Sequence, residues 1–398
     1  MSVEPAKPEP SFQSRKVLVC RESLLPYSET FIREQALTYS SWTPVFVGTK
    51  KVSQGVPLDA LDVRILPDSP RTLFGKAYEK VCRKLGVGQR TAVRLLRNEA
   101  ASLIHIHFAT DAVRYWPLIR ELRAPVVITL HGYDINTYPE WWRRDAASSA
   151  EKKYPARLLA LANCQRVHFV AVSEAIRRRA IEFGLPAERV HVRYIGIDLT
   201  RFRFAGRHIS QRAPRILYVG RFVEKKGGEY LLHAFAKVRE QAPEAELVMV
   251  GDGPLLGRLK NLAQELHVPV NFLGKLGSTQ VIEQIHQARI FCLPSVTAQN
   301  GDAEGLPISL LEAQACGVPV VTSGRGVDEA VLNGTTGYTF PERDVEALTE
   351  HLIELLRNDA VAERMSLAAP RFMAQSFDIR RCTQALEGLY EQLVATRH

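Results

Sequence analysis

Two glutamates frame the start of an expected helix. Glu304 stands in the preceding loop, directly before Gly305-Leu306-Pro307, and Glu312 lies eight residues later inside the helix. Proline suits the first helical position, where its missing N–H is not needed. A helix N-terminus beside a glycine presents free backbone N–H groups, and phosphate is the usual anion bound there. The pattern therefore indicates a phosphate-containing ligand.

An arginine and a lysine form a second candidate site between Gly220 and Gly227. Arg221 follows an expected strand, and Lys226 precedes an expected helix. A planar guanidinium and a compact ammonium can together neutralise a diphosphate. An exposed basic loop without a ligand is the alternative interpretation. A P-loop is excluded, because G-x-x-x-x-G-K-[ST] is absent.

A third segment, Gly251-Asp252-Gly253, begins like the fingerprint of a dinucleotide-binding loop. Leu256 stands where that fingerprint needs its third glycine, so we do not expect a nicotinamide-dependent reaction. Gly253 fits either a tight turn or a loop that approaches a nucleotide closely.

Three histidines lie in or just after expected strands. His131 follows the strand at residues 126–130 and precedes Gly132, where the chain can turn sharply. Ligands of open α/β sheets bind beyond the carboxyl ends of the strands, so we expect His131 in the site. His105 and His107 alternate along another strand and face the same side. We expect these two to be core histidines or to support the site from behind.

Alternating strands and helices must position these side chains. We expect a parallel sheet with helices on both faces in each half of the chain. Two such sheets facing each other would enclose a cleft at their carboxyl edges. A helix should also follow the first strand, with Ser28 as its N-cap and Glu29 in its first turn. The expected strands are residues 16–20, 44–48, 63–66, 103–107, 126–130 and 167–172 in the first half, and 215–220, 246–250, 270–273 and 290–293 in the second.

The length of 398 residues is too great for one ordinary domain. No apolar run reaches the roughly 18 residues of a transmembrane helix, and the polar, proline-rich start does not resemble a secretory signal. The six cysteines contain no CxxC pair, which favours buried, reduced thiols in a cytoplasm. We expect a disordered lead-in at 1–15, a domain at 16–200, a linker at 201–214, a second domain at 215–375, and a C-terminal helix at 376–398 that packs back on the first domain.

The excess positive charge lies entirely in the first half. Residues 1–200 contain 30 Lys and Arg against 20 Asp and Glu, whereas residues 201–398 contain 22 against 23. Basic and apolar side chains alternate over residues 71–97, as in one or two amphipathic helices. A solvated helix face is one interpretation. The one we favour is a docking surface for anionic lipid or a lipid-linked phosphate.

From about residue 16 onward, the chain resembles glycosyltransferase family 4, which comprises retaining sugar-nucleotide transferases of GT-B fold. Two of its segments are similar to the bacterial exopolysaccharide subgroup that contains colanic acid and amylovoran enzymes. Those two are Ser28-Glu29-Thr30-Phe31 and His131-Gly132-Tyr133-Asp134-Ile135; the wider resemblance adds Gly196-Ile197-Asp198, Arg221 with Lys226, and Glu304-x7-Glu312 with Gly305-Leu306-Pro307.

The resemblance implies a role for each matching residue. The catalytic residues would be His131, Arg221, Lys226 and Glu304, with the cations on the donor diphosphate and Glu304 facing the transferred sugar. Glu312 would bind the ribose hydroxyls. Further donor-binding residues would be Gly220, Gly253, Lys275, Leu276, Gly305, Leu306 and Pro307, and the acceptor-side residues would be Tyr27, Ser28, Glu29 and His107.

The chain departs from the family pattern at two places. Pro26-Tyr27-Ser28 replaces the usual Gly-Gly loop after the first strand, so the acceptor side should have a different shape. Ile195 replaces an asparagine that often precedes the Gly-x-Asp turn, so no role is expected for that side chain.

The implied reaction moves a sugar from a UDP- or GDP-sugar to a lipid-linked or saccharide acceptor, with retention of configuration, in exopolysaccharide or other cell-surface glycan synthesis. No metal or other cofactor is expected, because cationic side chains and helix dipoles would stabilise the departing nucleotide. The implied acceptor is a polyprenyl-diphosphate-linked glycan, and the implied location is cytoplasmic, at the inner membrane face.

Three alternatives remain at this point. A sugar-nucleotide epimerase or a phosphorylase would have the same two-domain shape. A basic nucleic-acid-binding protein is less favoured, because the chain lacks interleaved stacking aromatics and any known binding motif. The sequence leaves the donor sugar, the base and the linkage open.

Overall fold

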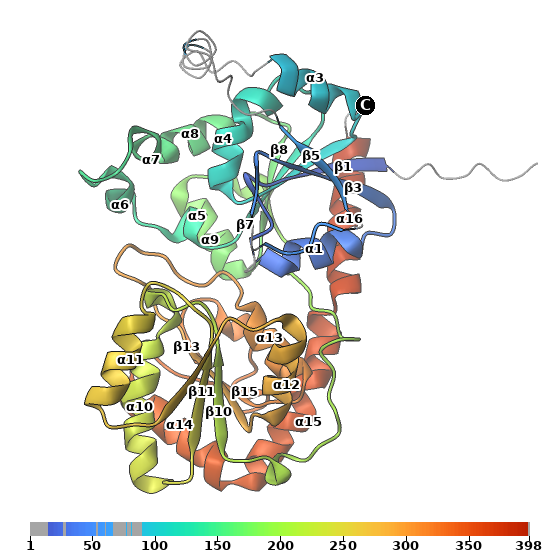
Figure 1. The fold of residues 1–398 in the computed structure, drawn as a ribbon. Helices are drawn as coiled ribbons and strands as arrows, with labels where there is room; N and C mark the ends of the chain where they lie inside the picture. Colours follow the sequence, from blue (N-terminus) through green and yellow to red (C-terminus); the bar gives the residue numbers. More distant parts are fainter. Residues whose placement is uncertain are drawn as a thin grey trace, which may run out of the picture.

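A computed structural model describes residues 15–26, 29–52, 55–59, 61–66, 77, 81 and 90–396. Two α/β domains lie one above the other in Figure 1, and the C-terminal helix returns from the second domain to the first. The two sheets agree with the alternating pattern of strands and helices, and the arrangement is the GT-B fold that the family resemblance implies. Tyr27, Ser28, residues 1–14 and most of the basic segment 71–97 lie outside the described residues.

The first domain is built on a parallel sheet. Among the described residues it has seven strands in the order β5-β3-β1-β6-β7-β8-β9. Every residue of β6 and β7 is buried, because helices cover both faces and the strands are apolar on both. The strands are β1 (Arg15–Cys20), β3 (Trp42–Gly48), β5 (Asp62–Ile65), β6 (Leu103–His107), β7 (Val126–Leu130), β8 (Val167–Ala171) and β9 (Val190–Val192), with a separate pair of β2 (Ser23–Leu24) and β4 (Lys50–Lys51). The helices are α1 (Thr30–Leu37), α3 (Arg90–Asn98), α4 (Ala109–Ile119), α5 (Tyr133–Asn136), α6 (Pro139–Arg143), α7 (Ser149–Lys152), α8 (Tyr154–Ala162) and α9 (Glu174–Phe183).

The second domain repeats this plan with a six-stranded parallel sheet, ordered β12-β11-β10-β13-β14-β15 among the described residues. Its strands are β10 (Arg215–Val219), β11 (Glu246–Val250), β12 (Val270–Gly274), β13 (Ile290–Pro294), β14 (Val320–Ser323) and β15 (Gly337–Thr339). The helices are α10 (Gly228–Gln241), α11 (Leu256–Glu265), α12 (Ser278–Gln287), α13 (Ile308–Ala315), α14 (Val345–Arg357), α15 (Asp359–Ser376) and α16 (Ile379–Ala395).

Helix α16 belongs to the first domain by its contacts. Figure 1 shows it running from the second domain up to β1 and β3. Tyr390 is fully buried there, and its hydroxyl group forms a 2.6 Å hydrogen bond with Nδ1 of His105. The carboxylate of Glu387 accepts hydrogen bonds from three successive backbone N–H groups before and at the start of β3, those of Ser40, Ser41 and Trp42.

The helix and strand boundaries expected from the sequence differ from the observed ones at a few positions. Helix α1 begins at Thr30 with Glu29 as its N-cap residue, one position later than the Ser28 cap we expected. Pro307 is the N-cap residue of α13 rather than its first helical residue. Strands β9 and β15 have three residues each, too few for an alternating pattern to reveal them.

Candidate active site

The strand order places both halves of the site. In each sheet the strand order reverses between two neighbouring strands. These are β1 and β6 in the first domain and β10 and β13 in the second. Ligands of open α/β sheets bind at such a switch point, beyond the carboxyl ends of the strands. The chain leaves β6 at His107, leaves β7 just before His131, and leaves β10 just before Gly220 and Arg221. The expected residues therefore gather from distant parts of the sequence.

Lys226 and Glu304 form an ion pair in the second domain. The Lys226 Nζ atom lies 3.1 Å from Oε1 of Glu304, and both side chains are largely buried. The neighbouring Lys225 pairs with Asp302 at 3.0 Å. The backbone ties the same segments together, because the N–H of Val296 donates to the carbonyl of Lys225. The basic turn and the loop before α13 thus act as one unit.

This pairing keeps Glu304 ionised. Burial alone would raise the pKa of its carboxyl, but the ammonium groups of Lys226 and Lys225 outweigh burial and lower the pKa. A carboxylate in this state accepts hydrogen bonds and is a poor proton donor at neutral pH. Glu304 can therefore bind hydroxyl groups or stabilise positive charge.

Two glycines allow the two domains to touch directly at Glu304. A Cβ atom added at Gly305 would lie 2.2 Å from the carbonyl oxygen of His131. A Cβ added at Gly132, whose φ is +134°, would lie 2.8 Å from the carbonyl oxygen of Ala303. Asn136 adds a side-chain hydrogen bond to that same Ala303 carbonyl, at 3.2 Å. The turn that carries His131 and the turn that carries Glu304 are therefore in backbone contact.

His131 is held by aromatic rings and by a second histidine. Its Nε2 atom lies 3.1 Å from Nδ1 of His107, and the two rings stack. Phe108 and Phe31 contact the imidazole, with ring centroids 4.4 and 5.2 Å away. Burial and the positive charge of Arg21 lower the pKa of His131 well below its usual range. His107, expected on the acceptor side, is itself fully buried behind His131.

Asp134 positions His131 and was not among our predicted site residues. This fully buried carboxylate accepts hydrogen bonds from the backbone N–H groups of His131 and Gly132, at 3.1 and 3.0 Å, and from that of Ala109. Burial raises the pKa of Asp134 to about 6, although these hydrogen bonds act to lower it. Local spacing did not reveal this role, because an aspartate in a turn usually bonds backbone groups that follow it, and Asp134 bonds groups that precede it.

Glu29 joins a buried charge cluster that the sequence did not reveal. The Arg21 guanidinium binds both carboxylate oxygens of Glu29, at 2.6 and 2.8 Å, and it also binds Asp111. The same guanidinium lies 4.4 Å from the centre of the Phe108 ring. Arg21 and Asp111 are 90 residues apart, so spacing carries no signal of their meeting. Phe108 lies between this cluster and His131, because its ring contacts both the Arg21 guanidinium and the His131 imidazole.

Glu312 lies apart from Glu304, in a pocket between the domains. Burial raises the pKa of its carboxyl to about 8; Arg201 opposes this rise and Glu34 adds to it. Arg201, from the segment between the domains, pairs with Glu34 of α1 at 2.9 Å and also donates to the hydroxyl of Ser278. The pocket is lined by Thr30, Phe31, Glu34, Gly196, Ile197, Asp198, Arg201, Phe202, Ser278, Ile308, Glu312 and Ile379.

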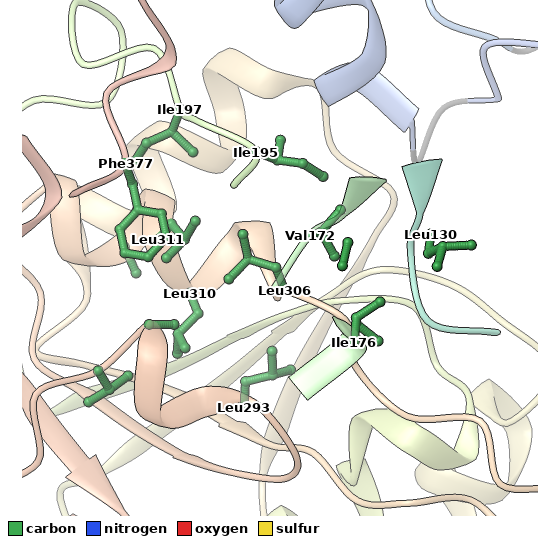
Figure 2. Packing of buried hydrophobic residues seen from close by; sticks show 14 of the residues in the cluster. Leu130, Val172, Ile176, Ile195, Ile197, Leu293, Leu306, Leu310, Leu311 and Phe377 are labelled. Carbon is green, nitrogen blue, oxygen red and sulfur yellow. The ribbon is translucent and has the colours of Figure 1, made fainter. Parts of the chain in front are cut away.

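Leu306 has a structural role at this junction. Figure 2 shows its side chain among buried apolar residues of both domains. Val172 and Ile176 belong to the first domain, and Leu293 and Leu310 to the second.

The other expected donor residues surround the carboxyl end of the second sheet. Arg221 is exposed beyond β10, next to Gly220. A Cβ at Gly253 would lie 2.4 Å from the carbonyl oxygen of Phe222, so this glycine is required by the loop packing. Lys275 pairs with Asp252 at 3.2 Å, and Leu276 follows it. Tyr27 and Ser28 lie outside the described residues.

The described part of the chain contains no helix that is long and apolar enough to cross a membrane.

Two family models match adjoining parts of the chain. Residues 54–201 match "Glycosyltransferase Family 4", and residues 201–372 match "Glycosyl transferases group 1". The amylovoran biosynthesis glycosyltransferase AmsK of Erwinia amylovora is 30% identical over 294 residues, which cover 73% of this chain and 70% of AmsK. WcaL of Salmonella typhimurium, assigned as a colanic acid biosynthesis glycosyltransferase, is 30% identical over 68% of this chain and 65% of its own length.

The fold matches a solved structure over almost the whole chain. The crystal structure of Anabaena HepE in complex with UDP and glucose superposes with a TM-score of 0.76 at 19% identity, covering 95% of this chain and 100% of HepE.

Proposed function

The chain belongs to glycosyltransferase family 4, and on this premise we propose that it transfers a sugar, with retention of configuration, from a nucleotide-sugar donor to a glycan acceptor carried on a lipid diphosphate. The observation that carries the proposal is the Lys226–Glu304 ion pair, which stands before the N-terminus of α13 and in contact with the turn of His131. A cation, an ionised carboxylate and a helix N-terminus are thereby brought to one place.

The donor diphosphate would bind at the second domain. The first N–H groups of α13 and the ammonium of Lys226 supply positive partial and full charge, and the exposed Arg221 can close over the outer phosphate oxygens. As the bond between the anomeric carbon and the diphosphate breaks, negative charge grows on the leaving oxygen. These groups would stabilise that charge without needing to move.

Glu304 and His131 would act on the transferred sugar. The carboxylate of Glu304 is ionised, so it can accept hydrogen bonds from sugar hydroxyls and favour positive charge at the anomeric carbon. The acceptor hydroxyl would attack the face from which the diphosphate leaves, and its proton would pass to the departing phosphate oxygen. One C–O bond breaks and one forms on the same face, so the configuration is retained.

A two-step experiment tests this function. UDP- and GDP-sugars are first screened for thermal stabilisation of the protein, because a bound ligand raises apparent stability by mass action. The stabilising donor is then incubated with polyprenyl-diphosphate-linked acceptors. We expect transfer by the wild type and its loss in Lys226→Ala and Glu304→Ala. The control is Lys237→Ala, an exposed lysine that pairs with Glu346 on the surface.

Two results would contradict the proposal. If Glu304→Ala and Lys226→Ala transferred sugar at the wild-type rate, the site would lie elsewhere. If the protein converted sugar nucleotides without an acceptor, the epimerase alternative would replace the transferase.

We further propose that the basic first domain attracts the protein to an anionic membrane surface. In α3 the apolar side chains Ala92, Val93 and Leu96 are buried in the domain core, whereas Arg94 and Arg97 are exposed. Such a helix contributes charge and not an inserted apolar face, so binding should be electrostatic and sensitive to salt. We expect co-sedimentation with vesicles that contain anionic lipid at low salt, reduced in Arg94→Gln/Arg97→Gln. Equal binding to neutral vesicles would contradict this mode.

A further inference from the structure

His107 and His131 share one hydrogen bond, which has two possible directions. Nδ1 of His107 and Nε2 of His131 lie 3.1 Å apart. Burial and the positive charges around the pair lower the pKa of both imidazoles well below the usual range, so both rings are neutral. A neutral imidazole carries one proton, on either Nδ1 or Nε2. One of the two facing nitrogens must therefore donate, and the other must accept.

The surroundings of His107 decide between the two directions. Its other nitrogen, Nε2, is completely buried and has no hydrogen-bond partner among the described residues. If His131 donated, the proton of His107 would have to sit on this Nε2, as a buried N–H without an acceptor. Such buried, unpaired N–H groups are rare in folded proteins, because leaving the donor without an acceptor is destabilising. If His107 donates, Nε2 carries only a lone pair, which is easier to bury.

We propose that His107 is a positioning residue that donates its Nδ1–H to Nε2 of His131 and so fixes the tautomer of His131. Because Nε2 of His131 accepts, its remaining proton is on Nδ1. Nδ1 of His131 has no hydrogen-bond partner among the described residues and stays available to a ligand. His131 then presents a hydrogen-bond donor to an oxygen of the substrate and cannot take a proton through that nitrogen.

This inference deepens the proposed function, and the effect of the tautomer on sugar transfer rests on that function. The tautomer itself can be measured without any substrate. Long-range ¹H–¹⁵N NMR on ¹⁵N-histidine-labelled protein distinguishes a protonated Nδ1 from a protonated Nε2, and the spectrum of His131→Gln identifies the His131 signals. We expect the Nδ1–H form for both His131 and His107. A spectrum with the proton of His131 on Nε2 would overturn the proposal.

A pair of variants of equal shape tests the positioning role. In His107→Asn the amide nitrogen can take the place of Nδ1, so the hydrogen bond is retained. In His107→Leu it is lost. We expect kcat/KM for transfer to fall by about tenfold in His107→Leu, as for loss of one ordinary hydrogen bond, and to stay within about threefold of wild type in His107→Asn. The NMR spectrum of His107→Leu should show both tautomers of His131.

The matched control is His105→Asn, on the same strand. His105 is also fully buried, and it bonds Thr129 and Tyr390 instead of His131. This variant should lower the melting temperature and leave the His131 tautomer unchanged. If the Leu and Asn variants of His107 lost activity equally, in proportion to their melting temperatures, His107 would be only structural. If no donor supported transfer by the wild type, the proposed function would fail, and the NMR result would still decide the tautomer.

Discussion

Glu329 of the second domain accepts a hydrogen bond from the backbone N–H of Glu174, at 2.9 Å, and so completes the N-terminus of helix α9 in the first domain. Its other oxygen accepts from the N–H of Ala175 at 3.2 Å, and the Tyr194 hydroxyl donates at 2.9 Å to the same oxygen that accepts from Glu174. A carboxylate at a helix N-terminus is favourable for the helix dipole. This contact exists only while the two domains are together, so it stabilises the closed arrangement that joins His131 to Glu304.

Substitution of Glu329 should shift the enzyme toward an open form. In Glu329→Ala the N-terminus of α9 loses its acceptor and Tyr194 loses its partner. The stability of the closed state relative to an open one should therefore fall by about 1–3 kcal/mol. We expect a larger radius of gyration by small-angle X-ray scattering and a donor KM raised about tenfold. Asp328→Ala is the control, because Asp328 is the adjacent, exposed carboxylate. Unchanged scattering in Glu329→Ala would contradict the role of this contact.

The Lys226–Glu304 pair should show strong energetic coupling. In Lys226→Met the buried Glu304 loses its nearest cation, and the remaining Lys225 compensates only in part. Removal of one partner from a buried pair typically costs about 3–5 kcal/mol of stability. Because Lys225 remains, we expect a smaller loss of about 2–3 kcal/mol. The double variant Lys226→Met/Glu304→Gln should recover part of this loss. Urea unfolding of all four proteins measures the coupling, and additive losses would mean that the pair is not formed in solution.

An alanine at Gly305 should separate the two domains locally. Its Cβ would meet the carbonyl oxygen of His131 at 2.2 Å, and rotation of a side chain cannot relieve a contact with the backbone. We expect Gly305→Ala to destabilise the protein by about 1–3 kcal/mol and to reduce transfer strongly. Gly257→Ala is the control: Gly257 lies in helix α11 with nothing within 4 Å of an added Cβ, and alanine should be neutral or stabilising there. Equal behaviour of the two variants would contradict direct backbone contact.

Glu312 should make stability depend on pH in a defined direction. Its pKa is raised from 4.5 to about 8 in the folded chain, chiefly by burial. Between these values the native protein binds a proton that the unfolded chain does not, so the contribution of Glu312 to stability falls as pH rises. Glu312→Gln cannot ionise and should therefore gain stability over wild type from pH 5 to pH 8. The difference between the two urea midpoints is the measurement, and a constant difference across this range would contradict the raised pKa.

The return of α16 should stabilise the first domain through Glu387. This buried carboxylate accepts from the backbone N–H groups of Ser40, Ser41 and Trp42, at 2.9, 2.8 and 3.2 Å. Glu387→Ala leaves these donors without a protein partner and should cost about 2–3 kcal/mol. Glu391→Ala is the matched control, since Glu391 is on the same helix and its pair with Arg15 is exposed. Equal melting temperatures for the two variants would contradict the role of Glu387.

The sequence by itself determined the fold class and the family. Apolar strands that alternate with amphipathic helices indicate two parallel sheets. The motifs around His131, Arg221, Lys226 and Glu304 resemble those of glycosyltransferase family 4, and this resemblance implies a sugar-nucleotide transferase. These features are local: strand ends, turn glycines and helix starts lie within a few residues of one another. The matches to family 4 and to AmsK confirm the family. The roles of the individual site residues remain predictions.

The tertiary structure decided which side chains meet. In the sequence, Glu304 and Glu312 form one motif around the start of a helix. The fold instead pairs Glu304 with Lys226 and places Glu312 beside Arg201 and Glu34. It also turned His107 from an acceptor-side candidate into the buried partner of His131. Such pairings join residues that are tens to hundreds of positions apart. They depend on the strand order of two sheets and on the close approach of the domains, and neither leaves a periodic signal in the chain.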